Sequence, residues 1–231
     1  MKNLGIQISD QTVLNILSKN GIPIAPDRKK EKTWKEFIKL HTDQLWACDF
    51  FLVPILTLTS IQHYHVFVFI QYCTRQIKIV GVRARPDGEW MEQIARNITG
   101  FEEVPDCKYL IHDRDPLYTL KFDQIFKDSG ITPIKTPPRS PNLNPYAERV
   151  IRSIKEECLD NLIILGETNL RRILKNYTEH YHFERCHQGI ENKIINSNNN
   201  DVLKHSQDTD DPIEVKERLG GLLKYYYRQQ A

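Results

Sequence analysis

Apolar and polar positions between residues 45 and 83 follow the pattern of β-strands. Three segments there are rich in Val, Ile, Phe and Trp, residue types that are enriched in strands. They span Leu45 to Val53, His65 to Gln71 and Gln76 to Arg83. Because only a short polar break separates the last two segments, the pattern predicts a meander of antiparallel strands.

The pattern after residue 86 changes to the period of a helix. Trp90, Ile94 and Ile98 recur at a spacing of four, which predicts a helix from Asp87 to Gly100. Short apolar runs predict two more strands, at Lys108 to Ile111 and Thr132 to Lys135. Further helices are predicted at Leu120 to Lys127, Asn144 to Asp160 and Asn169 to His182. Strands followed by alternating helices and strands predict an α/β domain with a mixed sheet.

Shorter elements flank this core. Residues 9–20 are predicted to form an amphipathic helix that Ser9 caps. The prolines of residues 22–26 predict an extended linker. Residues 196–211 are rich in Asn, Asp and Ser and are predicted to be a flexible linker. Lys216 to Gln230 is predicted to form a terminal helix with a Leu and Tyr face.

The composition limits the class of protein. The chain has 231 residues, 40% hydrophobic and 27% charged, which suits one large domain with appendages and excludes collagen-like, disordered and disulfide-rich proteins. Its longest apolar stretch, Phe50 to Thr59, falls short of the ~20 residues of a membrane-spanning helix, and no secretory signal is recognisable. Five scattered cysteines predict reduced thiols. We therefore expect a cytoplasmic protein with no membrane partner.

The charge of the chain is distributed in local patches. Its net charge is only +2, so nucleic-acid binding would depend on such patches rather than on a global basic field. Residues 28–39, which include Lys29 and Lys30, carry six Lys or Arg against two Glu. A run of this kind is usually solvated surface, but between a helix and a core it can also hold phosphates.

Two aspartates stand where surface charge is unusual. Asp49 interrupts an apolar run, and charged residues are rarely buried unless they are paired or bind a metal. A strand-edge position or a buried salt bridge is the alternative. Asp113 directly follows a predicted strand, where ligands gather in open α/β sheets. Its alternative is a turn residue before Pro116, an interpretation that fits Asp115 better.

Glu148 lies early in a predicted helix and shares a face with cations. Ala147, Ile151, Ile154 and Cys158 recur as the buried face. Glu148, Arg152 and Lys155 form a different face, as a site that handles a phosphodiester would need. The alternative is an acid that the helix dipole favours, paired with Arg152. Glu157 points the opposite way, and Glu156 lies roughly 12 Å further along the helix.

Three other features have simpler interpretations. His180, His182, Cys186 and His187 match no zinc-finger spacing, so His187 and Arg185 are expected to pack and to form hydrogen bonds against the core. The tail Tyr225 to Arg228 could stack on bases, but such a tail more often docks on its own domain or on a partner. Cys48 is expected to be a core residue.

Several of these motifs resemble those of a known family. They are Trp-Ala-Cys-Asp-Phe-Phe (46–51), His-Asp-Arg-Asp (112–115) and Pro-Arg-Ser-Pro-Asn-Leu-Asn-Pro-Tyr-Ala-Glu-Arg (138–149), with Tyr-His-Phe-Glu-Arg-Cys-His-Gln-Gly-Ile (181–190) further on. In this order they resemble the integrase-like transposases, the bacterial insertion-sequence branch of the retroviral-integrase superfamily of DDE enzymes. The resemblance covers about residues 33–192.

The resemblance implies a fold and a reaction. The fold would be ribonuclease-H-like, with a mixed five-stranded sheet flanked by helices. Asp49, Asp113 and Glu148 would be the catalytic residues and would hold two Mg²⁺ or Mn²⁺ ions for DNA cleavage and strand transfer. The alternatives are an inactive DNA-binding remnant and a metal-dependent nuclease of the ribonuclease-H type. Asp-Arg-Asp-Pro replaces the Asp-x-Gly of many relatives, so Asp115 remains an alternative to Asp113.

The resemblance also implies partners and domains. Double-stranded DNA, at element ends and targets, and a second copy of the chain are the expected partners, in the bacterial cytoplasm near the nucleoid. The expected DNA contacts are Arg139, Asn144, Arg152, Lys155, Lys29 and Lys30. Residues 1–40 would be a remnant of an N-terminal helical DNA-binding module with a basic linker, 41–192 the integrase catalytic core and 193–231 a linker and tail. Because only eight residues precede Ser9, we expect an internal or frame-shifted start.

Overall fold

The computed structural model describes residues 9–21, 34–101, 103–137, 144–196 and 212–228. It divides into two compact units, Met1–Leu40 and His41–Ala231. The first unit contains α1 (Asp10–Lys19) and nearly all of α2 (Trp34–His41). The Ser9 hydroxyl accepts a hydrogen bond from the Thr12 N–H, so the predicted cap of α1 is confirmed.

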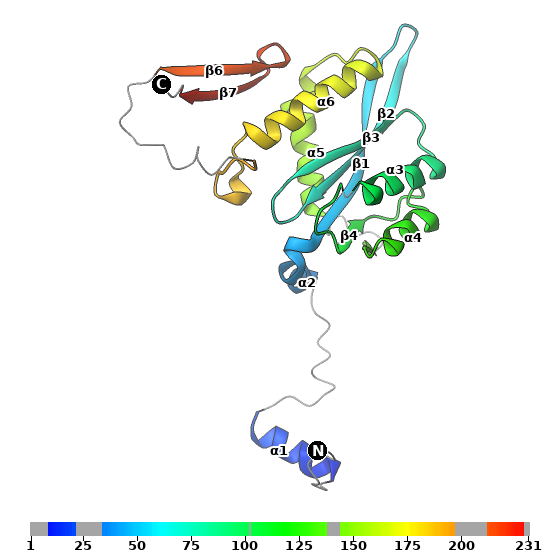
Figure 1. The fold of residues 1–231 in the computed structure, drawn as a ribbon, viewed down its shortest axis with the longest axis vertical. Helices are drawn as coiled ribbons and strands as arrows, with labels where there is room; N and C mark the ends of the chain where they lie inside the picture. Colours follow the sequence, from blue (N-terminus) through cyan, green and yellow to red (C-terminus); the bar gives the residue numbers. More distant parts are fainter. Residues whose placement is uncertain (1–8, 22–33, 102, 138–143, 197–211, 229–231) are drawn as a thin grey trace. The chain divides into compact units, whose positions relative to one another are not determined.

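A five-stranded mixed sheet forms the second unit (Figure 1). Its strands are β1 (Leu45–Leu56), β2 (Ile61–Gln71), β3 (Ile77–Arg83), β4 (Tyr109–His112) and β5 (Thr132–Lys135), in the order β3-β2-β1-β4-β5. The first three strands pair antiparallel, whereas β4 is parallel to both β1 and β5. The predicted meander and the mixed sheet are both confirmed, and the first two strands are longer than predicted.

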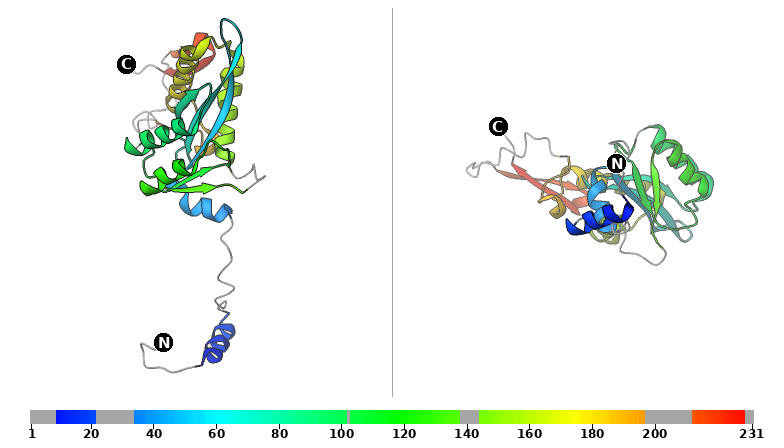
Figure 2. Two further views of the ribbon diagram at one scale, coloured as in Figure 1. Left: turned by 90° about the vertical axis from the view of Figure 1, so that its right-hand side faces the viewer. Right: turned by 90° about the horizontal axis from the view of Figure 1, so that it is seen from below.

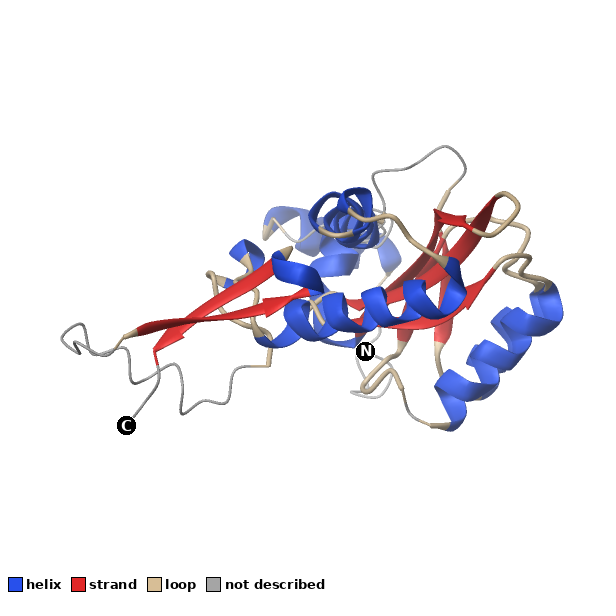
Figure 3. Ribbon diagram, turned by 90° about the horizontal axis from the view of Figure 1, so that it is seen from above, coloured by secondary structure: helices blue, strands red, loops and turns tan. Residues whose placement is uncertain are grey.

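Helices flank the sheet (Figure 2 and Figure 3). They are α3 (Gly88–Gly100), α4 (Leu120–Asp128), α5 (Pro145–Glu157) and α6 (Gly166–Phe183). Helices α3 and α4 pack on a core that includes Trp46, Cys48, Phe67 and Phe69, whereas α5 contacts β1 and β2 and α6 contacts β3. Since successive side chains of a strand point to opposite faces, the residues between these core positions face α5 and α6.

Two local features place α3 on the sheet. The Asp87 carboxylate caps the helix by accepting a hydrogen bond from the Trp90 N–H. Gly81 on β3 leaves room for the helix, because a Cβ there would lie only 2.5 Å from the Trp90 ring. A larger residue at this position would push α3 away from the core.

The C-terminal segment corrects one prediction. The helix predicted from Lys216 to Gln230 is wrong: β6 (Ile213–Arg218) and β7 (Leu223–Arg228) form an antiparallel hairpin. The turn contains Gly220 and Gly221 at φ +70° and +90°, a left-handed conformation that interrupts a helix. The linkers predicted at 22–26 and, from residue 197 on, at 196–211 lie outside the described residues. Among the described helices, none has the length and apolarity needed to span a membrane.

Candidate active site

Asp49 lies in the middle of β1, on the face that α5 covers. Its neighbour Cys48 is fully buried on the opposite face, as the strand alternation requires. The pairing of β1 with β4 ends at Ala47, so the edge of β1 that faced β4 is open beside Asp49. The Phe50 N–H donates to Asp49 Oδ1 over 2.7 Å. This carboxylate therefore lies half-buried just beyond the end of the β1–β4 ladder.

Asp113 and Asp115 follow the carboxyl end of β4, close to the point where its ladder with β1 ends. Asp113 Oδ1 accepts a hydrogen bond from the Asp115 N–H over 3.0 Å, and Asp115 Oδ1 accepts one from the Leu117 N–H over 2.8 Å. Both side chains are exposed. Both aspartates therefore stabilise the turn after β4, and their side chains are still exposed to solvent.

A cavity of about 710 Å³ is lined by residues of β1 and α5. Asp49 and Glu148 line it together with Arg152 and Lys155, and Asp115 lines it whereas Asp113 does not. Lys155 Nζ lies 5.7 Å from the centre of the Phe51 ring. The prediction that Glu148, Arg152 and Lys155 share a face away from the buried Ala147, Ile154 and Cys158 is confirmed. Ile151, which was predicted to lie on the buried face, is instead only partly buried and lines the cavity beside Glu148.

The charges around Asp49 repel one another. Burial raises the pKa of Asp49 to about 6, with further contributions from the negative charges of Asp113, Glu148 and Asp115, although the bond from the Phe50 N–H lowers it. Among the described residues, no three acidic, His or Cys side chains are close enough together to hold one metal ion. The carboxylates are thus near enough to interact but spread around the cavity.

Of the other lining residues, His65 and Asp160 were not singled out from the sequence, whereas Glu156 was considered and set aside as too far along the helix from Glu148. His65 on β2 lies opposite Leu52 of β1, and both reach the cavity. Glu156 and Asp160 line it as well, further along α5 and just after it. The position of His65 depends on the register of the β1–β2 hairpin, and no pattern in the sequence fixes that register.

The remaining predicted DNA contacts divide into two groups. Asn144 is only 6% exposed, and its Nδ2 donates to the Cys48 carbonyl over 3.3 Å. Its amide thus points into the protein instead of toward solvent. Arg139, Lys29 and Lys30 lie outside the described residues.

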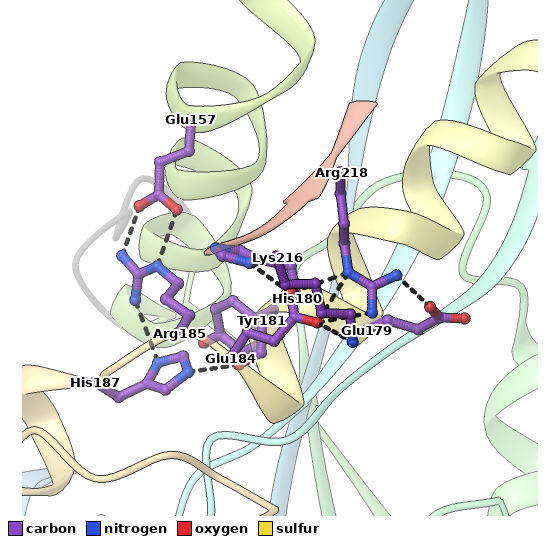
Figure 4. A network of polar contacts seen from close by, with 9 residues as sticks. All are labelled: Glu157, Glu179, His180, Tyr181, Glu184, Arg185, His187, Lys216 and Arg218. Atoms are coloured by element: carbon purple, nitrogen blue, oxygen red, sulfur yellow. Dashed lines mark hydrogen bonds and ion pairs between the residues drawn. The ribbon is translucent and has the colours of Figure 1, made fainter. Parts of the chain in front are cut away.

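A second polar cluster lies at the end of α6 (Figure 4). Arg185 donates to Glu157 and lies 3.3 Å from His187, whose Nε2 is 2.7 Å from the Tyr181 carbonyl oxygen. The packing and hydrogen-bonding role predicted for Arg185 and His187 is therefore confirmed. Glu157 points away from Glu148, as its place on the helix predicted.

Glu184 joins this region to the C-terminal hairpin. Its carboxylate accepts hydrogen bonds from Arg218, with Nη2 at 2.8 Å, and pairs with Lys216 at 2.9 Å and with His180 at 3.0 Å. Burial alone would raise the pKa of Glu184, but these three partners hold it down at about 2. Arg218 also pairs with Glu179 over 2.6 Å. We call Glu184 with Arg218, Lys216, His180 and Glu179 the hairpin clasp.

The chain resembles integrases and transposases in sequence and in structure. Residues 129–194 match the integrase core domain family. No curated protein matches the chain. The catalytic core domain of BIV integrase is 17% identical, with a TM-score of 0.48 over 64% of this chain and 88% of that one.

Two further structures have higher TM-scores. One is a chain of the simian T-cell lymphotropic virus intasome in complex with PP2A regulatory subunit B56 gamma, 12% identical, with a TM-score of 0.52 over 81% of this chain and 68% of that one. The other is the catalytic domain of Mos1 mariner transposase, 9% identical, with a TM-score of 0.50 over 68% of this chain and 82% of that one.

The likeness to these two structures shows the fold, an integrase-like and ribonuclease-H-like α/β domain. Together with the matched segment, the fold supports a DDE integrase or transposase core, within the class of polynucleotidyl transferases. Such a core supports DNA integration or transposition as the general activity.

Proposed function

We propose that this chain cleaves and joins DNA strands, with Asp49, Asp113 and Glu148 as the carboxylates of a two-metal site. The observation that carries the proposal is the cavity that Asp49 and Glu148 line from β1 and α5, together with Arg152 and Lys155. It combines acids suited to divalent cations with cations suited to phosphates. Few structural roles require both kinds of side chain in one open cavity.

The donor set fits Mg²⁺ or Mn²⁺. The three carboxylates offer hard oxygen ligands and no thiolate or imidazole, so they would not select zinc. Mutual repulsion of the carboxylates contributes to the raised pKa of Asp49, and a bound cation would relieve it. Two such ions, when bound, would activate the attacking oxygen and stabilise the leaving oxygen of an in-line displacement.

The protein's own side chains would bind and orient the DNA. Arg152 and Lys155 would contact phosphates on either side of the reacting bond, and such contacts position DNA without reading its sequence. The proposed partners are the double-stranded ends of a mobile element, a target DNA and a second copy of the chain.

Three observations bear on the choice between Asp113 and Asp115. Of the two charges, that of Asp113 raises the pKa of Asp49 more, which favours Asp113 as its partner. Asp115 instead lines the cavity. Because the Asp115 N–H donates to Asp113 Oδ1, Asp115 can hold the carboxylate of Asp113 in place while Asp113 takes the ligand role.

The test is the joining of a labelled duplex end to a plasmid in Mn²⁺. We expect Asp49→Asn, Asp113→Asn and Glu148→Gln each to abolish joining and cleavage, because each removes an anionic ligand and keeps the side-chain shape. Asp106→Asn is a matched control, since Asp106 lies on an exposed turn at φ +55°, which Asn also tolerates.

The outcomes separate the alternatives. Wild-type protein that binds DNA but neither cleaves nor joins it would be an inactive remnant. Hydrolysis without joining would indicate a nuclease of the ribonuclease-H type. Loss of joining in Asp115→Asn with retention in Asp113→Asn would exchange the roles of these two residues.

A further inference from the structure

The end of the ladder between β1 and β4 leaves backbone groups of β1 that need new partners. The parallel ladder between the two strands ends at the pair of Ala47 and Ile111. Just beyond it, the Phe50 N–H is satisfied by the carboxylate of Asp49 itself. The Cys48 carbonyl, one residue before Asp49, is satisfied by the Asn144 side chain. Unpaired buried backbone groups are costly, so both contacts stabilise β1 where the ladder ends.

The Asn144 side chain makes this contact instead of the usual hydrogen bond of an N-cap residue. It is the N-cap residue of α5, where an Asn side chain normally accepts a hydrogen bond from the first turn of its own helix. No such side-chain bond forms here. The Asn144 side chain instead reaches across to β1, where its Nδ2 donates to the backbone carbonyl oxygen of the fully buried Cys48 over 3.3 Å.

The backbone of Asn144 is tied to the second proposed ligand. Its carbonyl oxygen accepts a hydrogen bond from the Glu148 N–H over 3.2 Å, the first bond of the helix. One residue therefore connects the strand position before Asp49 with the helix position of Glu148.

We infer that Asn144 is a positioning residue that sets the separation of Asp49 and Glu148 and so the affinity of the site for divalent cations. This inference rests on the proposed function. It replaces the DNA contact expected for Asn144, because a side chain that is 6% exposed and bonded to the sheet does not present its amide to a duplex. Removal of a group that orients a metal ligand commonly weakens metal binding by about 10–100-fold.

The experiment measures Mn²⁺ binding to the folded, full-length protein by isothermal titration calorimetry. Asn144→Ala removes the donor, and Asn144→Leu removes it while keeping the branched shape and the number of heavy atoms. The matched control is Asn161→Ala, because the Asn161 Nδ2 donates to the Glu156 carbonyl over 2.8 Å at the other end of α5. We expect both Asn144 variants to raise the Kd for Mn²⁺ about tenfold or more, and the control to stay within about twofold.

A second readout separates positioning from general damage. If Asn144 acts through the metal site, raising the Mn²⁺ concentration restores strand joining in Asn144→Leu, whereas it restores nothing in Asp49→Asn. An unchanged Kd in both folded Asn144 variants overturns the inference and leaves the proposed function standing. If neither variant folds, Asn144 supports the whole domain and the specific role is equally overturned. Wild-type protein that fails to bind Mn²⁺ contradicts the proposed function itself.

Discussion

The cavity and the hairpin clasp each contain a carboxylate that is largely removed from water, and the two carboxylates have opposite surroundings. Asp49 is next to other acids, and its pKa is raised to about 6 by burial and by their charges. Glu184 is next to Arg218, Lys216 and His180, and its pKa is lowered to about 2.

This difference separates a structural acid from a candidate functional one. The fold provides cations for Glu184, so this carboxylate stabilises the docking of the C-terminal hairpin. It provides no cation bonded to Asp49 among the described residues, only a backbone N–H and more negative charge. Carboxylates that have a perturbed pKa and no cationic partner within the protein are typical of sites that bind a ligand.

The largest expected effect on stability tests the clasp. Glu184→Gln leaves Arg218, with a side chain only 15% exposed, without its buried anion and should lower the free energy of unfolding by about 3 kcal/mol. Glu103→Gln removes an acid that is 47% exposed and paired with Lys78, so it should cost under about 1 kcal/mol. Urea unfolding at pH 7 measures both. Equal losses in the two variants would mean that burial does not distinguish the clasp from a surface ion pair.

The pH dependence of these effects should differ between the two regions. A lowered pKa stabilises the fold above the unfolded value near 4.3, so the contribution of Glu184 is lost as the pH falls toward about 2. The raised pKa of Asp49 has the opposite effect, because its ionised form destabilises the folded, metal-free protein at high pH. Asp49→Asn removes this effect, so the variant should be more stable than the wild type above about pH 6, and the difference should disappear below about pH 4. Urea unfolding across this range checks both signs, and a gain at pH 4 equal to that at pH 7 would contradict the account of Asp49.

The smallest expected effect concerns the cations of the cavity. Arg152→Ala and Lys155→Ala should each reduce the slope of log K against log salt for duplex DNA by roughly one, on any sequence. Arg96→Ala is the control, because Arg96 is exposed on α3 and contacts Gln93 and Glu92 instead of the cavity. Fluorescence anisotropy over a salt series gives the slopes. Slopes equal to the wild type in both cavity variants would remove this face of α5 from the DNA interface.

Much of the core could be predicted because its signals are local. The strand alternation around Asp49 and the helical face of Glu148 depend on residues within a few positions, and both are confirmed in the structure. Their meeting in one cavity also depends on the order β3-β2-β1-β4-β5, a long-range property. The family resemblance implied that Asp49, Asp113 and Glu148 share one site, but the strand order itself was not predicted.

The failures come from contacts that are distant in sequence. The C-terminal segment was predicted as a helix from its Leu and Tyr spacing, yet Gly220 and Gly221 turn it into a hairpin that Arg218 fastens to Glu184. The bond from the Asn144 amide to the Cys48 carbonyl spans 96 positions and was not predicted. No pattern within one segment reports such a pairing.

The measurement that tests the central claim most directly is the stability of wild type and Asp49→Asn with and without metal. In EDTA at pH 7.5, Asp49→Asn should be more stable than the wild type, because it removes a carboxylate that burial and neighbouring acids disfavour. Mn²⁺ at about 100 times its Kd should then stabilise the wild type by roughly 2.7 kcal/mol and Asp49→Asn far less. If Mn²⁺ stabilised both proteins equally, or if Asp49→Asn lost stability in EDTA as Glu184→Gln does, Asp49 would be a structural acid and the account would be wrong.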